Sequence, residues 1–266
     1  MRTVAQKKAA VNGSNRKGAP DVTTPAVAVK DLHKSFGSQK VLDGIDLQVR
    51  QGETLAVLGR SGIGKSVLLK LIIGLQKPDS GAVLIQGKDI GELKIKQLDE
   101  LRKKIGFLFQ GAALYDSMTV EENVAFPLRR HTGLAGAELK QRVQELLGSV
   151  GMEQDARKLP SQISGGMQKR VGMARALALD PEILLFDEPT AGLDPITADE
   201  IGKLIVELRK KHSVTSIVVT HDIHTARQFA DRVALINEGH IVADSVFDEL
   251  TKSRDPFVRR FLREAA

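Results

Sequence analysis

Near-continuous apolar runs recur along the chain and predict strands that are buried on both faces of a parallel sheet. The runs cover residues 54–58, 105–109, 183–186 and 216–219. Shorter stretches of alternating or β-branched residues lie between glycines and predict a small antiparallel sheet. These stretches cover residues 27–29, 41–49 and 83–86. The pattern as a whole favours an α/β fold with a mixed, mainly parallel core sheet and a small antiparallel β subdomain.

Helical patterns follow or separate the apolar runs. No convincing strand occurs between Gln110 and Ser164, so we interpret about 111–178 as an inserted helical subdomain with helices at 120–128 and 137–150. Other helices are predicted at residues 67–73, 165–178, 196–211 and 223–230. Three regions are expected along the chain: a flexible basic arm over 1–25, one domain over 26–250, and a C-terminal helical tail over 251–266.

Composition limits the classes of protein that fit. A chain of 266 residues with 42% hydrophobic residues can bury the core of one large domain. The sequence has no cysteine, which excludes disulfides and Cys-ligated zinc. No stretch approaches the run of about 20 apolar residues that crosses a bilayer, and no apolar segment follows the first basic residues as in a secretory signal. We therefore expect a cytoplasmic location.

The positive charge is concentrated at the start of the chain. The net charge is +6, and residues 1–20 hold five basic residues and no acid. Because the rest is close to neutral, we do not expect a nucleic-acid partner. The arm is expected to be a solvated tail, with a weak contact to anionic lipid head groups as the alternative. Its basic residues are Arg2, Lys7, Lys8, Arg16 and Lys17.

The segment after the first apolar run matches the phosphate-loop pattern G-x-x-x-x-G-K-[ST] and precedes a predicted helix. Glycines allow backbone N–H groups to close around phosphate, and the helix N-terminus adds its dipole. Lys65 is expected to reach the β and γ phosphates, and Ser66 to offer a hydroxyl to Mg²⁺. A glycine-rich turn without a ligand is the weaker alternative. The residues expected to hold the nucleotide here are Gly59, Arg60, Ser61, Gly62, Ile63, Gly64, Lys65, Ser66 and Val67.

Two carboxylates and a histidine stand at the ends of later apolar strands. Asp187 and Glu188 follow the run 183–186, and ligands of α/β sheets bind where parallel strands end. Asp187 suits Mg²⁺, directly or through water, and Glu188 suits a base that polarises an attacking water. His221 follows the run 216–219 in the same way and is expected to donate to the γ-phosphate. Such a strand end alone is usually a solvated loop, but here it accompanies a phosphate loop.

A second anion site is predicted where an alanine-rich helix begins. Ser164, Gly165, Gly166 and Met167 offer a hydroxyl and free backbone N–H groups at that helix end. The alternative is an ordinary N-cap with flexible glycines. One phosphate loop satisfies one triphosphate, so a second site in the same chain predicts that two molecules share each nucleotide.

The order of these motifs resembles the ABC (ATP-binding cassette) transporter ATPases over about residues 27–242. The resemblance implies a P-loop NTPase fold, with 26–250 as the ATPase domain. It also implies an enzyme that hydrolyses ATP with Mg²⁺ as a homodimer, docked on an integral-membrane permease dimer. The motifs in order are the phosphate loop, Gln110 after a strand, Ile163-Ser-Gly-Gly-Met167, the Asp187-Glu188 strand end, Ala191-Gly-Leu-Asp194 and His221.

The same resemblance assigns roles to single residues. It implies that Gln110 is the Q-loop glutamine, which takes part in catalysis and in holding Mg²⁺, and that His221 is the switch histidine. Residues 164–166 correspond to the signature and Asp194 to the D-loop aspartate. Phe36 falls where an aromatic residue, usually Tyr, stacks on adenine. The signature departs from Leu-Ser-Gly-Gly-Gln at its first and last positions, but its phosphate contacts belong to the serine and glycines, so activity is expected to survive.

Residues 111–129 resemble more narrowly the lipid-transporting Mce/Mla (maintenance of lipid asymmetry) branch, and the Ser-Gly-Gly-Met signature agrees. In that branch the ATPase pairs with a multi-span permease and an Mce-domain protein that handles phospholipid or related lipids. The resemblance implies a peripheral subunit on the cytoplasmic face of the inner membrane.

Three rivals remain: an ABC ATPase for another substrate class, one that acts on DNA or the ribosome, and a slow regulatory nucleotide switch. The long coiled-coil insertion of repair types and the paired cassettes of ribosomal types are not seen. The ready base Glu188 argues against the switch.

Overall fold

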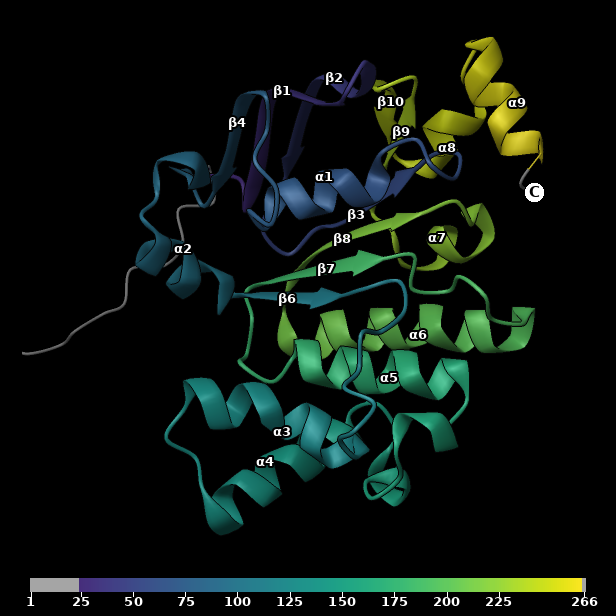
Figure 1. Ribbon diagram of the computed structural model, residues 1–266. Helices are drawn as coiled ribbons and strands as arrows, with labels where there is room; N and C mark the ends of the chain where they lie inside the picture. The colour runs from purple at the N-terminus through teal and green to yellow at the C-terminus, as the bar shows by residue number, and fades with distance from the viewer. Residues whose placement is uncertain (1–23, 265–266) are drawn as a thin grey trace, which may run out of the picture.

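A six-stranded sheet forms the centre of the computed structural model, which describes residues 24–264 (Figure 1). Its strand order is β10-β9-β3-β8-β7-β6, and all neighbouring strands are parallel except the edge pair β9 and β10. The expected α/β fold with a mixed core sheet is therefore confirmed. The strands are β3 (Thr54–Leu58), β6 (Ile105–Leu108), β7 (Ile183–Asp187), β8 (Thr215–Thr220), β9 (Arg232–Asn237) and β10 (His240–Ser245).

A separate antiparallel sheet covers one side of the molecule. Its order is β2-β1-β4-β5, with β1 at Val27–Phe36, β2 at Gln39–Val49, β4 at Ser80–Ile85 and β5 at Lys88–Asp89. The short strand predicted at 27–29 is wrong in length, because β1 continues for ten residues. Register shifts after Val29 and a positive φ of 42° at Asp31 break the alternation that the prediction relied on.

Alternate residues of the core strands face two separate hydrophobic cores. Leu55 and Val57 of β3 pack on the side of the antiparallel sheet and α1 (Lys65–Ile72). Ala56 and Leu58 pack on the opposite side, with α5 (Gly165–Ala176), α6 (Pro195–His212) and α7 (Ile223–Phe229). Burial on both faces explains why these strands read as unbroken apolar runs.

The segment between β6 and β7 is helical. It contains α3 (Val120–His131), α4 (Gly136–Gly148), the short 3-10 turns at Glu153–Asp155 and Pro160–Gln162, and α5. Thr119 caps α3, since its hydroxyl accepts from the Glu122 N–H and the Glu122 carboxylate accepts from the Thr119 N–H at 2.8 Å. Figure 1 shows α3 and α4 on the far side of α5 from the core sheet.

Several elements escaped the sequence prediction. They are the 3-10 turn Ile90–Glu92, α2 (Ile95–Arg102), β5, β9, β10 and α8 (Phe247–Thr251). A last helix, α9 (Pro256–Glu264), lies within the predicted C-terminal tail. The predicted basic arm lies outside the described residues except for its last two positions. No helix in residues 24–264 is both long and apolar enough to cross a membrane.

Candidate active site

The carboxyl ends of β3, β7 and β8 meet at one edge of the core sheet, where a cavity of about 360 Å³ opens. Parallel pairing brings together segments that are far apart in the sequence, as expected for ligand sites in α/β folds. The cavity gathers most of the phosphate loop with the proposed adenine-stacking, glutamine, base and histidine residues. Its lining is Phe36, Gln39, Val41, Ser61, Gly62, Gly64, Lys65, Ser66, Val67, Gln110, Glu188 and His221.

The loop that joins β3 to α1 depends on glycine at a defined position. Gly64 has a φ of +107°, and a Cβ built there would lie 2.6 Å from Cγ1 of Val41. Only glycine tolerates both the conformation and the close approach. Lys65 starts α1, is 5% exposed, and donates from Nζ to the carbonyls of Gly59 at 2.8 Å and Arg60 at 3.0 Å. The ammonium is thus held inside the curve of the loop.

Both strand-end carboxylates contact the phosphate loop. Lys65 Nζ lies 3.2 Å from Oε1 of Glu188, and the Ser66 hydroxyl donates to Oδ1 of Asp187 at 2.6 Å. Burial is the main cause that raises the pKa of Asp187 above its ordinary value, with the Ser66 hydrogen bond acting in the opposite direction. The groups that would bind phosphate and metal therefore bind each other, and these contacts must rearrange when a triphosphate enters.

Glu188 occupies a strained backbone position. Its φ is +47°, which non-glycine residues rarely adopt, and its N–H donates to the carbonyl of Val219 at 2.9 Å. His221 lies beside it: its Nδ1 is 2.9 Å from Oε2 of Glu188, and half of its side chain is exposed. His221 therefore holds the Glu188 carboxylate through Nδ1 and also lines the cavity. Non-glycine residues with a positive φ, such as Glu188, are concentrated at functional sites.

Gln110 and Phe36 stand at the rim. Gln110 follows β6 and is exposed at the cavity, while Phe36 ends β1 and is 48% exposed. The ammonium of Lys34 lies 5.5 Å from the centre of the Phe36 ring, in cation–π range. An exposed ring here offers a stacking face for a base.

The second predicted anion site does not line this cavity. The Ser164 hydroxyl caps α5 by accepting from the Met167 N–H at 3.3 Å. Asp194 caps α6 by accepting from the N–H groups of Ile196 and Thr197 at 3.1 and 3.0 Å. The two helix starts are neighbours, because a Cβ on Gly166 would lie 2.4 Å from Cγ2 of Thr197. Residues 164–167 and Asp194 thus form a separate face.

The residues around Asp187 fit a magnesium ion. Ser66 Oγ and Asp187 Oδ1 already place two hard oxygen donors 2.6 Å apart, and Mg²⁺ takes such oxygens together with phosphate and water. Among residues 24–264 no cluster of three or more His, Asp or Glu side chains forms a complete metal cage.

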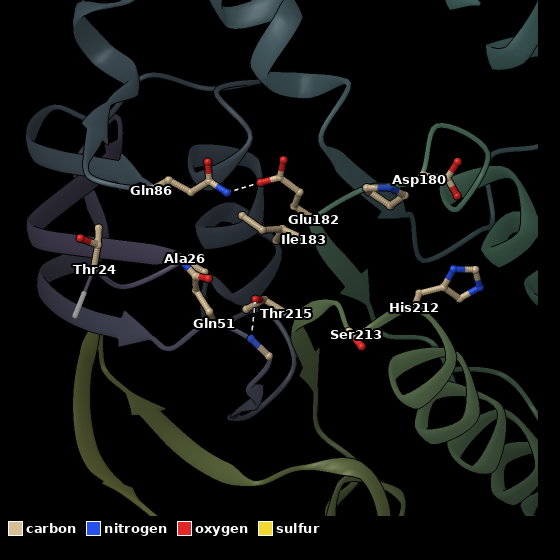
Figure 2. A pocket seen from close by; sticks show the side chains of 12 residues that line it. Thr24, Ala26, Gln51, Gln86, Asp180, Glu182, Ile183, His212, Ser213 and Thr215 are labelled. Carbon is tan, nitrogen blue, oxygen red and sulfur yellow. Dashed lines mark hydrogen bonds between the residues drawn. The ribbon is translucent and has the colours of Figure 1, made fainter. Parts of the chain in front are cut away.

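A larger cavity, of about 650 Å³, lies at the opposite, amino ends of β7 and β8 (Figure 2). Its carboxylates are already engaged: Glu182 pairs with Lys104 at 2.8 Å and bonds Gln86, and Asp180 pairs with Arg142 at 2.5 Å. None of the predicted nucleotide residues lines it. Many of the predicted nucleotide residues gather instead at the smaller cavity, where the strands end.

Three residues near the site were missed in the sequence. Gln39 and Val41 line the cavity from β2, and their ordinary strand context gave no signal. Lys169, on α5, is 5% exposed and its Nζ contacts the backbone carbonyls of Gln110 and Glu188. Lys169 carried no signal in the sequence, because α5 carries other polar and basic residues as well.

Comparison with known proteins finds many relatives, of which three of similar identity illustrate the range. The probable ribonucleotide transport ATP-binding protein mkl of Mycobacterium leprae is 44% identical, over 89% of this chain and 68% of its own. The methionine import ATP-binding protein MetN of Mesorhizobium japonicum is also 44% identical, over 88% and 66%. The intermembrane phospholipid transport system ATP-binding protein MlaF of Haemophilus influenzae is 41% identical, over 89% and 90%. The chain thus spans about two thirds of the first two relatives.

A solved structure agrees with this grouping. The dimeric structure of a post-hydrolysis state of the ATP-binding cassette MJ0796, bound to ADP and Pi, is 36% identical with a TM-score of 0.76. It covers 83% of this chain and 98% of its own. The family model for the ABC transporter matches residues 42–191, which include the phosphate loop, the signature and the Asp187-Glu188 strand end. The chain therefore belongs to the ABC transporter family, as one of its ATP-hydrolysing cassettes.

Proposed function

We propose that this cassette hydrolyses ATP in the 360 Å³ cavity with Glu188 as the base. The gathering of Lys65, Gln110, Glu188 and His221 around one space is the observation that carries the proposal. Lys65 would hold the β and γ phosphates, and Glu188 would accept a proton from the attacking water. His221 would hold the Glu188 carboxylate in place and donate to the γ-phosphate. Bound Mg²⁺ would neutralise charge on the phosphate oxygens.

The second part of the proposal is that two copies share each nucleotide. The signature face carries the Ser164 hydroxyl at the N-terminus of α5 but does not line the cavity of its own chain. Ile196, next to Asp194 on the same face, is 75% exposed, which is unusual for a large apolar residue and favours an interface. The related cassette that was solved as a dimer bound to ADP and Pi supports a dimer for this chain.

A permease is proposed to dock on the surface from Gln110 to Arg129. An apolar groove of about 420 Å³ lies there, between β6, α3 and α5, and is lined by four aromatic rings. These are Phe107, Phe109, Tyr115 and Phe126. Such a groove fits an apolar helix of a membrane partner.

Hydrogen bonds fix the backbone of Tyr115 at the edge of this groove. Its N–H donates to Oδ1 of buried Asn123 at 2.8 Å, and the Asn123 amide donates back to its carbonyl at 3.1 Å. The ring is 4.9 Å from that of Phe126, and the side chain is 45% exposed. Val124 and Leu128 are buried in the core of the helical segment.

Replacing Tyr115 and Met118 together by alanine is expected to weaken recovery of the permease in a pull-down and to lower membrane-stimulated ATPase activity several-fold. ATP binding should stay within about twofold, since neither residue lines the nucleotide cavity. The matched control is Ile95→Ala, because Ile95 is 80% exposed on α2, away from the groove. Equal recovery of permease by the double variant and wild type would place the docking surface elsewhere.

We further propose that the transported substrate is a phospholipid or related lipid. Two observations support this: residues 111–129, in the permease-facing segment, resemble the Mce/Mla branch, and the phospholipid-transport relative matches over 90% of its own length. The cassette would then be a peripheral subunit on the cytoplasmic face of the inner membrane, with an Mce-type protein in the complex. Methionine or ribonucleotide transport is the second candidate, favoured by relatives at 44% identity.

Purification of the tagged chain with its native membrane partners decides between these substrates. We expect an integral permease, an Mce-domain protein and lipid extractable from the complex, and ATPase activity that responds to phospholipid in reconstituted vesicles. Stimulation by methionine or ribonucleotides instead, with no bound lipid, would contradict the lipid proposal. Absence of any membrane partner, with turnover unchanged by membranes, would favour a non-transport ATPase.

A further inference from the structure

A buried cation lies between the catalytic segments without touching the nucleotide cavity. Lys169 is 5% exposed and belongs to α5, most of whose other buried residues are apolar or glycine. Removing an ammonium from water is costly, and a methionine would fill the same space without that cost. The charge and its hydrogen bonds must therefore serve something other than packing.

The ammonium of Lys169 contacts two backbone carbonyls, both from residues with proposed catalytic roles. Nζ donates to the carbonyl of Gln110, which follows β6, and to that of Glu188, which follows β7, at 3.0 Å. Within residues 24–264 it makes no direct ion pair with a carboxylate, although the charges of Asp187 and Glu188 act on it from nearby. Its direct partners are thus the backbones of these two turns.

The backbone turns at Gln110 and Glu188 both contain non-glycine residues with a positive φ, a conformation that neighbouring groups must stabilise. Glu188 has a φ of +47°, and Ala112 and Ala113, just after Gln110, have φ values of 58° and 49°. Arg175, further along α5, donates to the carbonyls of Ala112 and Ala113 at 2.7 Å each. Lys169 and Arg175 of α5 therefore both donate to backbone carbonyls of the Gln110 loop. Of these two side chains, only Lys169 also donates to the carbonyl of Glu188.

We propose that Lys169 is a positioning residue for hydrolysis, which ties the signature helix to the backbones of Gln110 and Glu188 and so sets where the base and the loop glutamine stand. This inference rests on the proposed roles of those two residues. Lys169 does not contact the phosphate loop, so its effect should fall on the chemical step and not on binding of ATP.

The test measures kcat, KM and ATP affinity for Lys169→Met, which keeps the length and loses the donor. A misplacement of about 1 Å can cost about 10²-fold in rate, so kcat should fall about 10- to 100-fold, with KM and Kd for ATP within about threefold of wild type. Lys169→Arg keeps the charge and the hydrogen-bond donors at similar volume. Its kcat should be at least tenfold higher than that of Lys169→Met. Lys203→Met is the control, because Lys203 is exposed on α6 and its ammonium pairs with Asp199 at 2.7 Å.

Each other outcome overturns the proposal. A wild-type kcat in Lys169→Met would show that the hydrogen bonds of Lys169 to Gln110 and Glu188 do not affect hydrolysis. Failure of Lys169→Arg to restore kcat would show that the hydrogen-bond donors of this side chain are not what hydrolysis requires. Loss of ATP affinity or of melting temperature in proportion to kcat would show a merely structural role. Glu188→Gln, run in the same assay, separates the proposed base role of Glu188 from the positioning role of Lys169. If Glu188→Gln is inactive while Lys169→Met has normal activity, only the inference about Lys169 fails.

Discussion

Replacing Glu188 by glutamine is expected to lower ATP turnover by about 10² to 10⁴, the range typical of a lost general base. Glutamine keeps the shape and can still accept from His221 Nδ1, now 2.9 Å from Oε2, but it cannot accept the proton of water. ATP binding should be preserved or strengthened, because the carboxylate that pairs with Lys65 at 3.2 Å competes with phosphate for the ammonium. Steady-state phosphate release and equilibrium nucleotide binding give the two quantities.

A matched control comes from the other end of the same strand. Glu182 precedes β7, is exposed and pairs with Lys104. Glu182→Gln therefore removes a carboxylate beside the same strand without altering the 360 Å³ nucleotide cavity. Its turnover should match wild type. Turnover of Glu188→Gln near that of the control would remove Glu188 from the mechanism.

Replacing Ser164 by arginine is expected to abolish ATP-dependent dimerisation and to reduce turnover by more than about 10²-fold, while one chain still binds ATP through its own phosphate loop. The arginine fills the space that a partner's triphosphate would occupy. It also removes the N-cap of α5, which costs about 1 kcal/mol of stability. Ser164→Asp separates these effects, because aspartate keeps the cap but repels phosphate.

A mixture of Lys65→Ala chains with Ser164→Arg chains extends this test. In a mixed dimer both lesions fall in one shared site and the other site is intact, so some activity is expected to return although each parent is inactive. Coupling between the sites can suppress a lone site, so dimer formation measured by sedimentation is the firmer readout. Normal ATP-dependent dimers of Ser164→Arg alone would contradict a shared site.

The sequence predicted the parts of the fold in which local pattern and tertiary context agree. The strand at 54–58 was predicted to the residue, because burial on both faces leaves an unbroken apolar run between polar ends. The strand β1 was predicted too short, since its register shifts hide the alternation beyond Val29. The strand β9 also carries an apolar run, Val233 to Ile236, although no strand was predicted there.

The site was predicted to the extent that its residues follow strands or begin helices. The cavity brings together Lys65, Gln110, Glu188 and His221 because the topology orders β3, β8, β7 and β6 side by side. Lys169 could not be placed in this way, because a lysine on a helix usually faces water and its role depends on which backbone turns pack against that face. Contacts of side chains with backbone carbonyls leave no spacing pattern in the sequence.

The central claim, a nucleotide site completed by a second copy, is tested most directly by the mass and nucleotide content of Glu188→Gln with ATP and Mg²⁺. Size-exclusion chromatography with light scattering gives the mass, and nucleotide extraction gives the stoichiometry. The account predicts a dimer of the 28.9 kDa chain that carries two ATP molecules and dissociates when ATP is removed. A chain that stays monomeric with one ATP tightly bound would contradict it.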